Sequence, residues 1–387
     1  MSNPKKTKGT TSMMFQPRSK ASVRARITKT AAMALGVTEL TIAFGLVASD
    51  RSVAQPSTDH GASVLVFPLF DSRDMSDTII SITNTNTSLE ACPESDTRAG
   101  DVGLRYVYVD AAEFIEFDRF EFLTPGDTLS VLASRHNPEG DSGYLVVVAL
   151  SAADFSLSAS FDALIGSATV IRVDMDQAWT YRPYGFRSIQ ERSEPCVDVD
   201  TDVDADGAID FDGIEYEYFP RRLRLASFLS KNESFDNRLA MLSLAGFAYT
   251  SDVRFSIWNN IEDLYRRNLR FLHYFDGDLS DVSTVVRNLG GDREEFDFLD
   301  IESGWIELEG TRLTDPAGNP VRNRGGGLAI PPILAVYVGS VVGTNSAFGH
   351  ALHVDGQLDG LEVGAFGSGD GDPQQAPPEV SLGVGGW

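Results

Sequence analysis

The stretch FDRFEFLTPGDTLSVLAS, residues 117–134, has the pattern of two short β-strands separated by a turn. Aromatic and β-branched residues fill its two ends, and the turn-forming sequence Pro-Gly-Asp at 125–127 separates them. Because no long helical pattern lies between such strands, the sequence predicts an antiparallel β-sandwich. Similar segments recur through the first half of the chain: SVLVFPLF (63–70), DTIISITNTN (77–86), GLRYVYV (103–109) and GYLVVVALS (143–151).

The second half of the chain resembles the first. Internal similarity of this kind predicts a duplicated sandwich, and the alternative is that short aromatic strands resemble one another by composition. The predicted fold is therefore mainly β, with two antiparallel, Ig-like β-sandwich domains joined by an acidic loop. Four pairs of segments occur in the same order: ISITN (80–84) and FSIWN (255–259), LRY (104–106) and LRF (269–271), SGY (142–144) and SGW (303–305), and FDAL (161–164) and FGHAL (348–352).

Composition and charge divide the 387 residues into five parts. Pro220 and a change of charge mark the boundary before the second half. The predicted parts are an export signal (1–54), a first β-sandwich (55–190), an acidic DxDxDG linker loop (191–220), a second β-sandwich (221–356) and a flexible Gly/Pro-rich tail (357–387).

Residues 1–54 contain the three elements of an export signal. The first thirty residues are basic, residues 31–48 are mostly apolar, and Ser52-Val53-Ala54 places small residues where a signal peptidase cleaves. An uncleaved membrane anchor is the alternative, but Glu39 within the apolar run favours cleavage. The sequence therefore predicts an exported protein, extracellular, on the cell surface or periplasmic, with no membrane span after signal removal.

The chain is strongly acidic, with a net charge of −24. Residues 1–54 contain nine basic and two acidic residues, a net charge of +7, so the mature chain would have a net charge of −31. An acidic surface repels nucleic acid and anionic lipid and attracts divalent cations. The sequence therefore predicts no nucleic-acid partner.

The chain contains two cysteines, Cys92 and Cys196. In an exported chain an isolated pair forms a disulfide more often than a catalytic thiol or a metal site. We therefore predict a bridge between an early loop and the edge of the acidic linker.

The acidic linker contains DVDADGAID (202–210), which resembles the calcium loops of EF-hands and dockerin-type repeats. Those loops supply oxygen ligands at positions 1, 3, 5, 7, 9 and 12, with glycine at position 6, here Gly207. Position 12 departs from the pattern because it is Gly213; Asp212, Glu215 or Glu217 would have to replace it. A structural calcium site is the prediction, and a solvated acidic spacer is the alternative. The predicted metal ligands are Asp202, Asp204, Asp206, the Ala208 carbonyl and Asp210.

Several longer segments, among them SVLVFPLFDS, FLTPGDTLSVLAS and AFGHALH, resemble an uncharacterised family of exported bacterial β-rich proteins. The resemblance implies export and a β-rich fold, and it supplies no catalytic residues.

The sequence predicts an exported, non-enzymatic protein with a structural or binding role and an unknown surface polysaccharide or protein as partner. The first alternative is a carbohydrate-binding or adhesin-like module, for which Trp258, Trp305, Tyr181 and Tyr184 are candidate aromatic residues. The second is a glycoside hydrolase that uses a carboxylate pair, for example within EEFDFLD (294–300).

Overall fold

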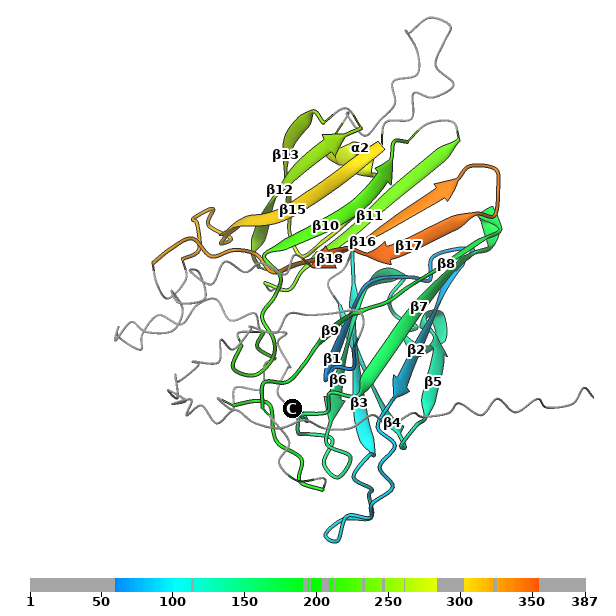
Figure 1. Cartoon of the computed structure of the whole chain (residues 1–387), viewed down its shortest axis with the longest axis vertical. Coiled ribbons are helices and arrows are strands. Elements are labelled where there is room, and N and C mark those ends of the chain that lie inside the picture. The colour runs from blue at the N-terminus through cyan, green and yellow to red at the C-terminus, as the bar shows by residue number, and fades with distance from the viewer. Residues whose placement is uncertain are drawn as a thin grey trace, which may run out of the picture. The chain divides into compact units, whose positions relative to one another are not determined.

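The described part of the chain is mainly β-strand, as predicted (Figure 1). Every described residue belongs to one compact unit, Arg51–Trp387, so the predicted division into 55–190 and 221–356 stays a prediction. The predicted export signal and tail lie outside the described residues. The computed structural model describes residues 60–112, 115–190, 194, 196–203, 209–211, 213–231, 234–245, 248–260, 262–283, 303–322 and 326–354.

The first nine strands form two antiparallel sheets, which we name sheet 1 and sheet 2. Sheet 1 has the order β4-β3-β6-β1-β9, with β1 (Val64–Asp71), β3 (Val102–Asp110), β4 (Glu116–Leu123), β6 (Ser142–Leu150) and β9 (Tyr184–Phe186). Sheet 2 has the order β5-β2-β7-β8, with β2 (Ser76–Asn84), β5 (Thr128–Leu132), β7 (Leu164–Arg172) and β8 (Gln177–Tyr181). The turn at 125–127 therefore carries the chain from sheet 1 to sheet 2.

The last nine strands form sheet 3 and sheet 4, also antiparallel. Sheet 3 has the order β13-β12-β15-β10-β18, with β10 (Arg222–Leu229), β12 (Thr250–Asn259), β13 (Leu264–Phe271), β15 (Ser303–Thr314) and β18 (His353–Val354). Sheet 4 has the order β14-β11-β16-β17, with β11 (Phe235–Ser243), β14 (Tyr274–Gly277), β16 (Ile333–Val341) and β17 (Ala347–Ala351). Short helices α1 (Ala133–His136) and α2 (Leu279–Val282) follow β5 and β14, and a 3-10 turn (Val173–Met175) follows β7.

The strand orders of the two halves correspond when nine is added to each strand number. Of the four pairs of similar segments, only SGY and SGW lie on corresponding strands, at the start of β6 and of β15. The other three pairs were matched wrongly; ISITN, for example, lies in β2, whereas FSIWN lies in β12. Short β-strands share composition, so a five-residue match did not identify the corresponding strand.

In both SGY and SGW, the backbone of the neighbouring strand lies so close to the glycine that the same residue is required there. A Cβ atom on Gly143 would lie 1.9 Å from the Val109 carbonyl oxygen, and one on Gly304 would lie 1.8 Å from the Trp258 carbonyl oxygen. No side chain fits at either position, so both strands require glycine there. The partner strands β1 and β10 also break register at corresponding places, between Phe67 and Phe70 and between Leu225 and Phe228.

Two hydrophobic clusters form the cores. Alternate residues of sheet 1, such as Leu65 and Tyr106, share one cluster with Ile80 of sheet 2. Phe255 of sheet 3 and Leu239 of sheet 4 belong to the other. Burying each such side chain stabilises the fold by about 1.5–3 kcal/mol relative to leaving it exposed.

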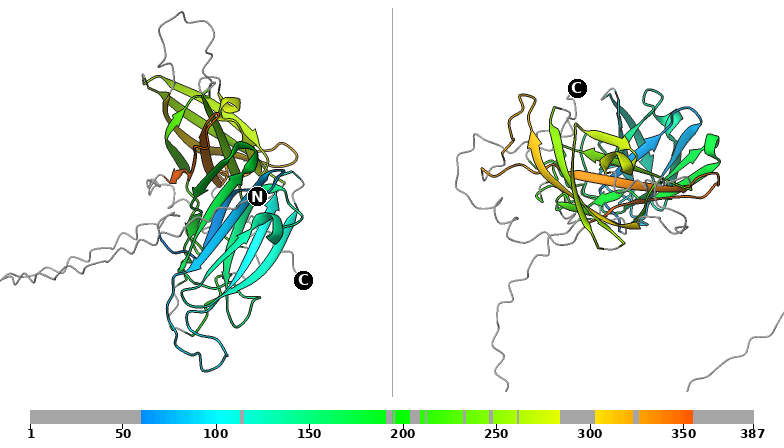
Figure 2. Two further views of the ribbon diagram at one scale, coloured as in Figure 1. Left: turned by 90° about the vertical axis from the view of Figure 1, so that its right-hand side faces the viewer. Right: turned by 90° about the horizontal axis from the view of Figure 1, so that it is seen from above.

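The two halves also contact each other. Strand β8 lies beside β17 (Figure 1). The Trp179 ring of β8 packs on Gly349 of β17. The Tyr184 hydroxyl of β9 donates to the carbonyl oxygens of Ala335 and Leu352, at 2.8 and 2.9 Å. Figure 2 shows the strands of the whole described chain from two further directions.

The C-terminal part of the acidic linker covers a sheet. Ile209, Phe211 and Tyr216 are buried in the same cluster as the outer face of sheet 1, and the Phe211 ring lies 4.5 Å from the Phe186 ring. We name residues 209–211 and 213–219 the cover segment. The alternative of a solvated acidic spacer is therefore wrong for these residues, because their apolar side chains alternate with the acidic ones.

Candidate functional site

The outer face of sheet 3 is rich in arginine side chains. Along β10, β12 and β15, apolar residues such as Leu223 and Phe255 point to the core, and alternate residues point outward. On the outward positions, Arg224 lies opposite Glu307, and Arg254 lies opposite Glu309. The sheet therefore presents a ladder of charged side chains on the face that points away from its core.

Six arginines share three carboxylates on this face, and we name them the arginine layer. Arg221 and Arg222 lie 3.4 and 3.7 Å from Glu309, and Arg254 also pairs with Glu309. Arg224 lies 3.1 Å from Glu307, while Arg270 and Arg312 each lie 2.6 Å from Asp252. The layer consists of Arg221, Arg222, Arg224, Arg254, Arg270 and Arg312.

The carboxylates lie beneath the arginines. The side chains of Glu309 and Asp252 are 7% and 13% exposed, whereas those of Arg254 and Arg270 are 45% and 59% exposed. A hydrogen bond from Arg270, assisted by one from Arg312, holds the pKa of Asp252 below its ordinary value. Asp252 therefore stays ionised and orients the guanidinium groups of Arg270 and Arg312, which lie outside it.

A pair of tryptophans lies at one end of the same face. Trp258 of β12 and Trp305 of β15 are directly opposite each other, and their rings stack with centroids 3.8 Å apart and planes at 4°. Both are partly exposed, and the Arg224 guanidinium lies 6.0 Å from the Trp305 ring centroid. The other two candidate aromatics, Tyr181 and Tyr184, are buried core residues. The arrangement combines aromatic surface with cationic hydrogen-bond donors.

A hollow of about 800 Å³ lies over the outer face of β3 and β4. Phe120, Phe122 and Phe155, each 38–44% exposed, line it together with Asp200 and Asp202. It occupies the part of the outer face of sheet 1 next to the cover segment.

The predicted calcium loop is only partly described. Asp202 and Asp210 are described, whereas Asp204, Asp206 and Ala208 lie outside the described residues. Within the described part of the chain, no group of three His, Cys, Asp or Glu side chains is arranged to hold a metal ion. The calcium site therefore stays a prediction.

Of the three suggested substitutes for the missing twelfth ligand, Glu215 and Glu217 are buried, and Asp212 lies outside the described residues. The Glu215 carboxylate accepts hydrogen bonds from the backbone N–H groups of Val203 at 2.7 Å and Asp210 at 3.1 Å. It therefore joins the two ends of the loop. The Glu217 carboxylate accepts from the Arg187 backbone N–H at 3.1 Å, and burial raises the pKa of Glu217 to about 7.

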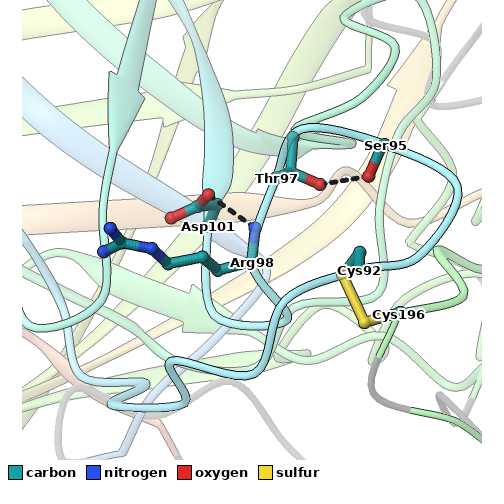
Figure 3. Close-up of a disulfide and its surroundings, with 6 residues drawn as sticks. All are labelled: Cys92, Ser95, Thr97, Arg98, Asp101 and Cys196. Atoms are coloured by element: carbon teal, nitrogen blue, oxygen red, sulfur yellow. Dashed lines mark hydrogen bonds between the residues drawn. A yellow bond between two sulfur atoms is a disulfide. The ribbon is translucent and has the colours of Figure 1, made fainter.

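The predicted disulfide between Cys92 and Cys196 is confirmed, with Cα atoms 5.3 Å apart (Figure 3). The loop around Cys92 is ordered by a hydrogen bond between the hydroxyls of Ser95 and Thr97 and by one from the Arg98 N–H to Asp101. The bridge ties this loop to the chain that leads into the cover segment.

Other chemistry-bearing motifs do not assemble a site among the described residues. Ser142, in a Gly-Asp-Ser-Gly stretch, begins β6 and is 9% exposed. His350 and His353 lie in β17 and β18, which belong to different sheets. The candidate carboxylates at 294–300 lie outside the described residues.

No protein-family model matches the chain, and no curated protein matches it. The resemblance to an exported bacterial family stays a prediction. No helix within the described residues has the length and apolar character needed to cross a membrane.

Sequence inspection missed the arginine layer, although a signal was present. Arginine alternates with leucine in RRLRL (221–225), and glutamate alternates with apolar residues in WIELEG (305–310). Alternation of this kind indicates one charged face. The net charge of −24 for the whole chain does not reveal the positive charge concentrated on the outer face of sheet 3.

Proposed function

We propose that this chain is an exported, non-enzymatic binding protein that holds a carbohydrate on the outer face of sheet 3. The observation that carries the proposal is the partly exposed, stacked pair of Trp258 and Trp305 beside Arg224. A sugar ring has an apolar face that packs on an aromatic ring, while its hydroxyls accept hydrogen bonds from guanidinium groups.

Export has independent support. The bond between Cys92 and Cys196 is of the kind that persists in oxidising compartments outside the cytosol. The basic and apolar segments of residues 1–54 are the second support.

We further propose that each half is an Ig-like β-sandwich and that the halves arose by internal duplication. The matching strand orders, Gly143 and Gly304, and the register breaks in β1 and β10 support this. The sequence DGQLDGLEV (355–363), which follows β18, also resembles DGAIDFDGIEY (206–216), which lies between β9 and β10.

Affinity electrophoresis through gels that contain soluble plant, algal or bacterial polysaccharides tests the binding function. We expect the wild-type protein to be retarded in at least one gel, and Trp305→Ala and Trp258→Ala to lose that retardation. The matched control is Phe120→Ala, which removes an exposed ring from sheet 1 and leaves sheet 3 unchanged. The proposal is wrong if no gel retards the protein, or if only the Phe120 variant loses retardation.

We also propose that calcium orders the acidic loop next to the cover segment. The spacing from Asp202 to Asp210 and the contact of Glu215 with both loop ends support a loop closed around a cation. Calorimetric melting of the mature protein with calcium and with chelator tests it. A higher melting temperature with calcium is expected, and identical curves would contradict the proposal.

A further inference from the structure

We propose that strand β4 pairs with β4 of a second copy of this chain, so that two copies of sheet 1 join into one continuous sheet about a two-fold axis. The inference goes beyond the proposed carbohydrate-binding function and does not depend on it. Three observations carry it: the length and regularity of this sheet edge, the backbone groups along it, and a side-chain sequence that is complementary to itself.

Strand β4 is a long and regular edge of sheet 1. It has eight residues, whereas the other edge strands of the first half, β5, β8 and β9, have five, five and three. Its pairing with β3 runs without a register shift, and its sequence EFDRFEFL contains no proline. Proteins protect sheet edges from further pairing with short strands, bulges and proline, so β4 lacks three common protections.

Half of the backbone groups of β4 point away from sheet 1. The carbonyl oxygen of Ile115, which immediately precedes β4, accepts a hydrogen bond from the last N–H group of β3 at 3.0 Å. Inward and outward residues alternate along an antiparallel pair, so the odd-numbered residues of β4 bond to β3 and the even-numbered residues point outward. Within the described part of the chain, the backbone groups of these even-numbered residues have no hydrogen-bond partner. A further strand would supply their partners.

The side chains of β4 match those of a second β4 when Phe120 lies opposite itself in an antiparallel pair. This register places Arg119 opposite Glu121 of the second copy, and the two-fold symmetry makes the same pair again. Oppositely charged residues directly across two strands stabilise their pairing. The remaining opposed residues bring no like charges together: Phe117 with Leu123, and Asp118 with Phe122.

Arg119 and Glu121 are both accessible to a second chain. Arg119 is exposed, and its Nε donates to the His136 carbonyl oxygen at 3.0 Å. The Glu121 side chain is 38% exposed, and the His136 imidazole lies 3.3 Å from it. Burial lowers the pKa of His136, so this ring is neutral at neutral pH and does not cancel the charge of Glu121. Each side chain therefore keeps its charge for a partner across the two-fold axis.

Two exposed aromatic rings lie on the outer face of the same edge. Phe120 and Phe122 are 44% and 42% exposed, and both line the hollow over sheet 1. In the joined sheet the rings from both copies lie on one face beside the two-fold axis, where they shield each other from water. Apolar burial therefore adds to the charge pairs.

The corresponding edge of the second half, β13, does not match itself in this way. Its sequence LYRRNLRF contains three arginines and no acid, so two copies of β13 would bring arginines together. Like charges across two strands are destabilising. Pairing through β4 alone uses the same edge of both copies, so assembly stops at a dimer and leaves sheet 3 outside the contact.

Sedimentation equilibrium of the mature protein tests the pairing, and we expect a reversible equilibrium between monomer and dimer. Arg119→Glu and Glu121→Arg should each weaken dimerisation at least about tenfold, because two attractive cross-strand pairs become repulsive. An equimolar mixture of these two variants should dimerise again, since the charges of one copy are then opposite to those of the other. The matched control is Arg266→Glu on β13, an exposed arginine whose replacement changes the charge as much as Arg119→Glu does and should have no effect.

Cysteine variants supply a second measurement in case a charge reversal unfolds the chain, which circular dichroism detects. Arg119→Cys mixed with Glu121→Cys should form a disulfide-linked dimer under mild oxidation, because Cβ atoms directly across two strands lie about 4.5–5.5 Å apart. Arg266→Cys mixed with Glu121→Cys should not form one. Absence of the link in the first mixture would overturn the inference.

Three results of the sedimentation experiment would also overturn it. A protein that stays monomeric at every concentration does not pair through β4. Assemblies larger than a dimer, or loss of association in Arg266→Glu, would show that β4 pairs with a different edge. Dimers that survive both charge reversals would place the contact on another surface. Carbohydrate binding is tested separately by affinity electrophoresis and stands or falls on that result.

Discussion

The outer faces of sheets 1 and 3 occupy corresponding positions in the two halves and have opposite character. On sheet 1 the face contains Val66, Val107 and Val146, all buried. On sheet 3 the corresponding strands place Arg224 and Glu307 outward, and part of that face remains exposed. One strand order therefore supports either an apolar outer face beneath a cover segment or a charged outer face.

The presence of a cover on sheet 1 accounts for this difference. After β9 the chain returns over sheet 1, and Phe211 and Phe219 pack on Phe186 at ring distances of 4.5 and 4.9 Å. An apolar sheet face needs such a cover because exposing it costs roughly 25 cal/mol per Å². Charged residues such as Arg224 and Glu307 occupy the corresponding face of sheet 3, and such a face needs no apolar cover to be stable in water.

The largest effect on the free energy of unfolding is expected when residues at corresponding positions of sheets 1 and 3 are exchanged. This exchange tests the comparison of the two faces. Val146 of β6 and Glu307 of β15 occupy the same place in their sheets. Val146→Glu buries an unpaired charge in the apolar outer face of sheet 1 and should lower the free energy of unfolding by more than about 4 kcal/mol. Glu307→Val on the open face should change it by no more than about 1 kcal/mol. Urea denaturation measures both, and equal effects would contradict the distinction between the faces.

Removing the disulfide should have the next largest effect and should act on the covered half. Replacing Cys92 and Cys196 with serine should lower the free energy of unfolding by about 2–5 kcal/mol, because the unfolded chain is no longer constrained. Hydrogen exchange should accelerate more at β1 and β6 than at β10 and β15, since the second half contains no cysteine. Uniform acceleration in all four strands would show that the bridge does not act through the cover.

The pH dependence of stability tests how the cover segment is held. Burial raises the pKa of Glu217 to about 7, so the folded protein retains a proton that the unfolded chain releases near pH 4.5. The stability that this group contributes is complete below about pH 4.5 and is lost as the pH rises through about 7. Relative to Glu217→Gln, the wild-type protein should therefore lose up to about 3 kcal/mol across that range. Parallel stability curves for the two proteins would place Glu217 in contact with solvent.

The sequence predicted the strands well because each is short, rich in aromatic and β-branched residues and bounded by turn residues. The segment 103–109, for example, lies within β3, and 143–151 overlaps β6 almost completely. The pairing of Cys92 with Cys196 was also predictable, because the chain contains only these two cysteines.

The sequence did not predict what lies on each face. The packing of Phe211 and Tyr216 on sheet 1 depends on contacts between residues far apart in the chain, which residue spacing does not encode. The arginine layer likewise unites residues from 221 to 312, and the total charge averages over them. Period-two alternation shows that a strand has two faces, but three-dimensional contacts decide which face is covered.

Hydroxyl-radical footprinting of the mature protein, with and without a polysaccharide that retards it in affinity electrophoresis, tests most directly which face binds the ligand. Both candidate surfaces carry reactive aromatic side chains, so one experiment compares them. We predict that the ligand lowers the oxidation rates of Trp258 and Trp305 severalfold and leaves those of Phe120 and Phe122 unchanged. Protection of Phe120 and Phe122, with Trp258 and Trp305 unaffected, would contradict the account and place the binding site on sheet 1.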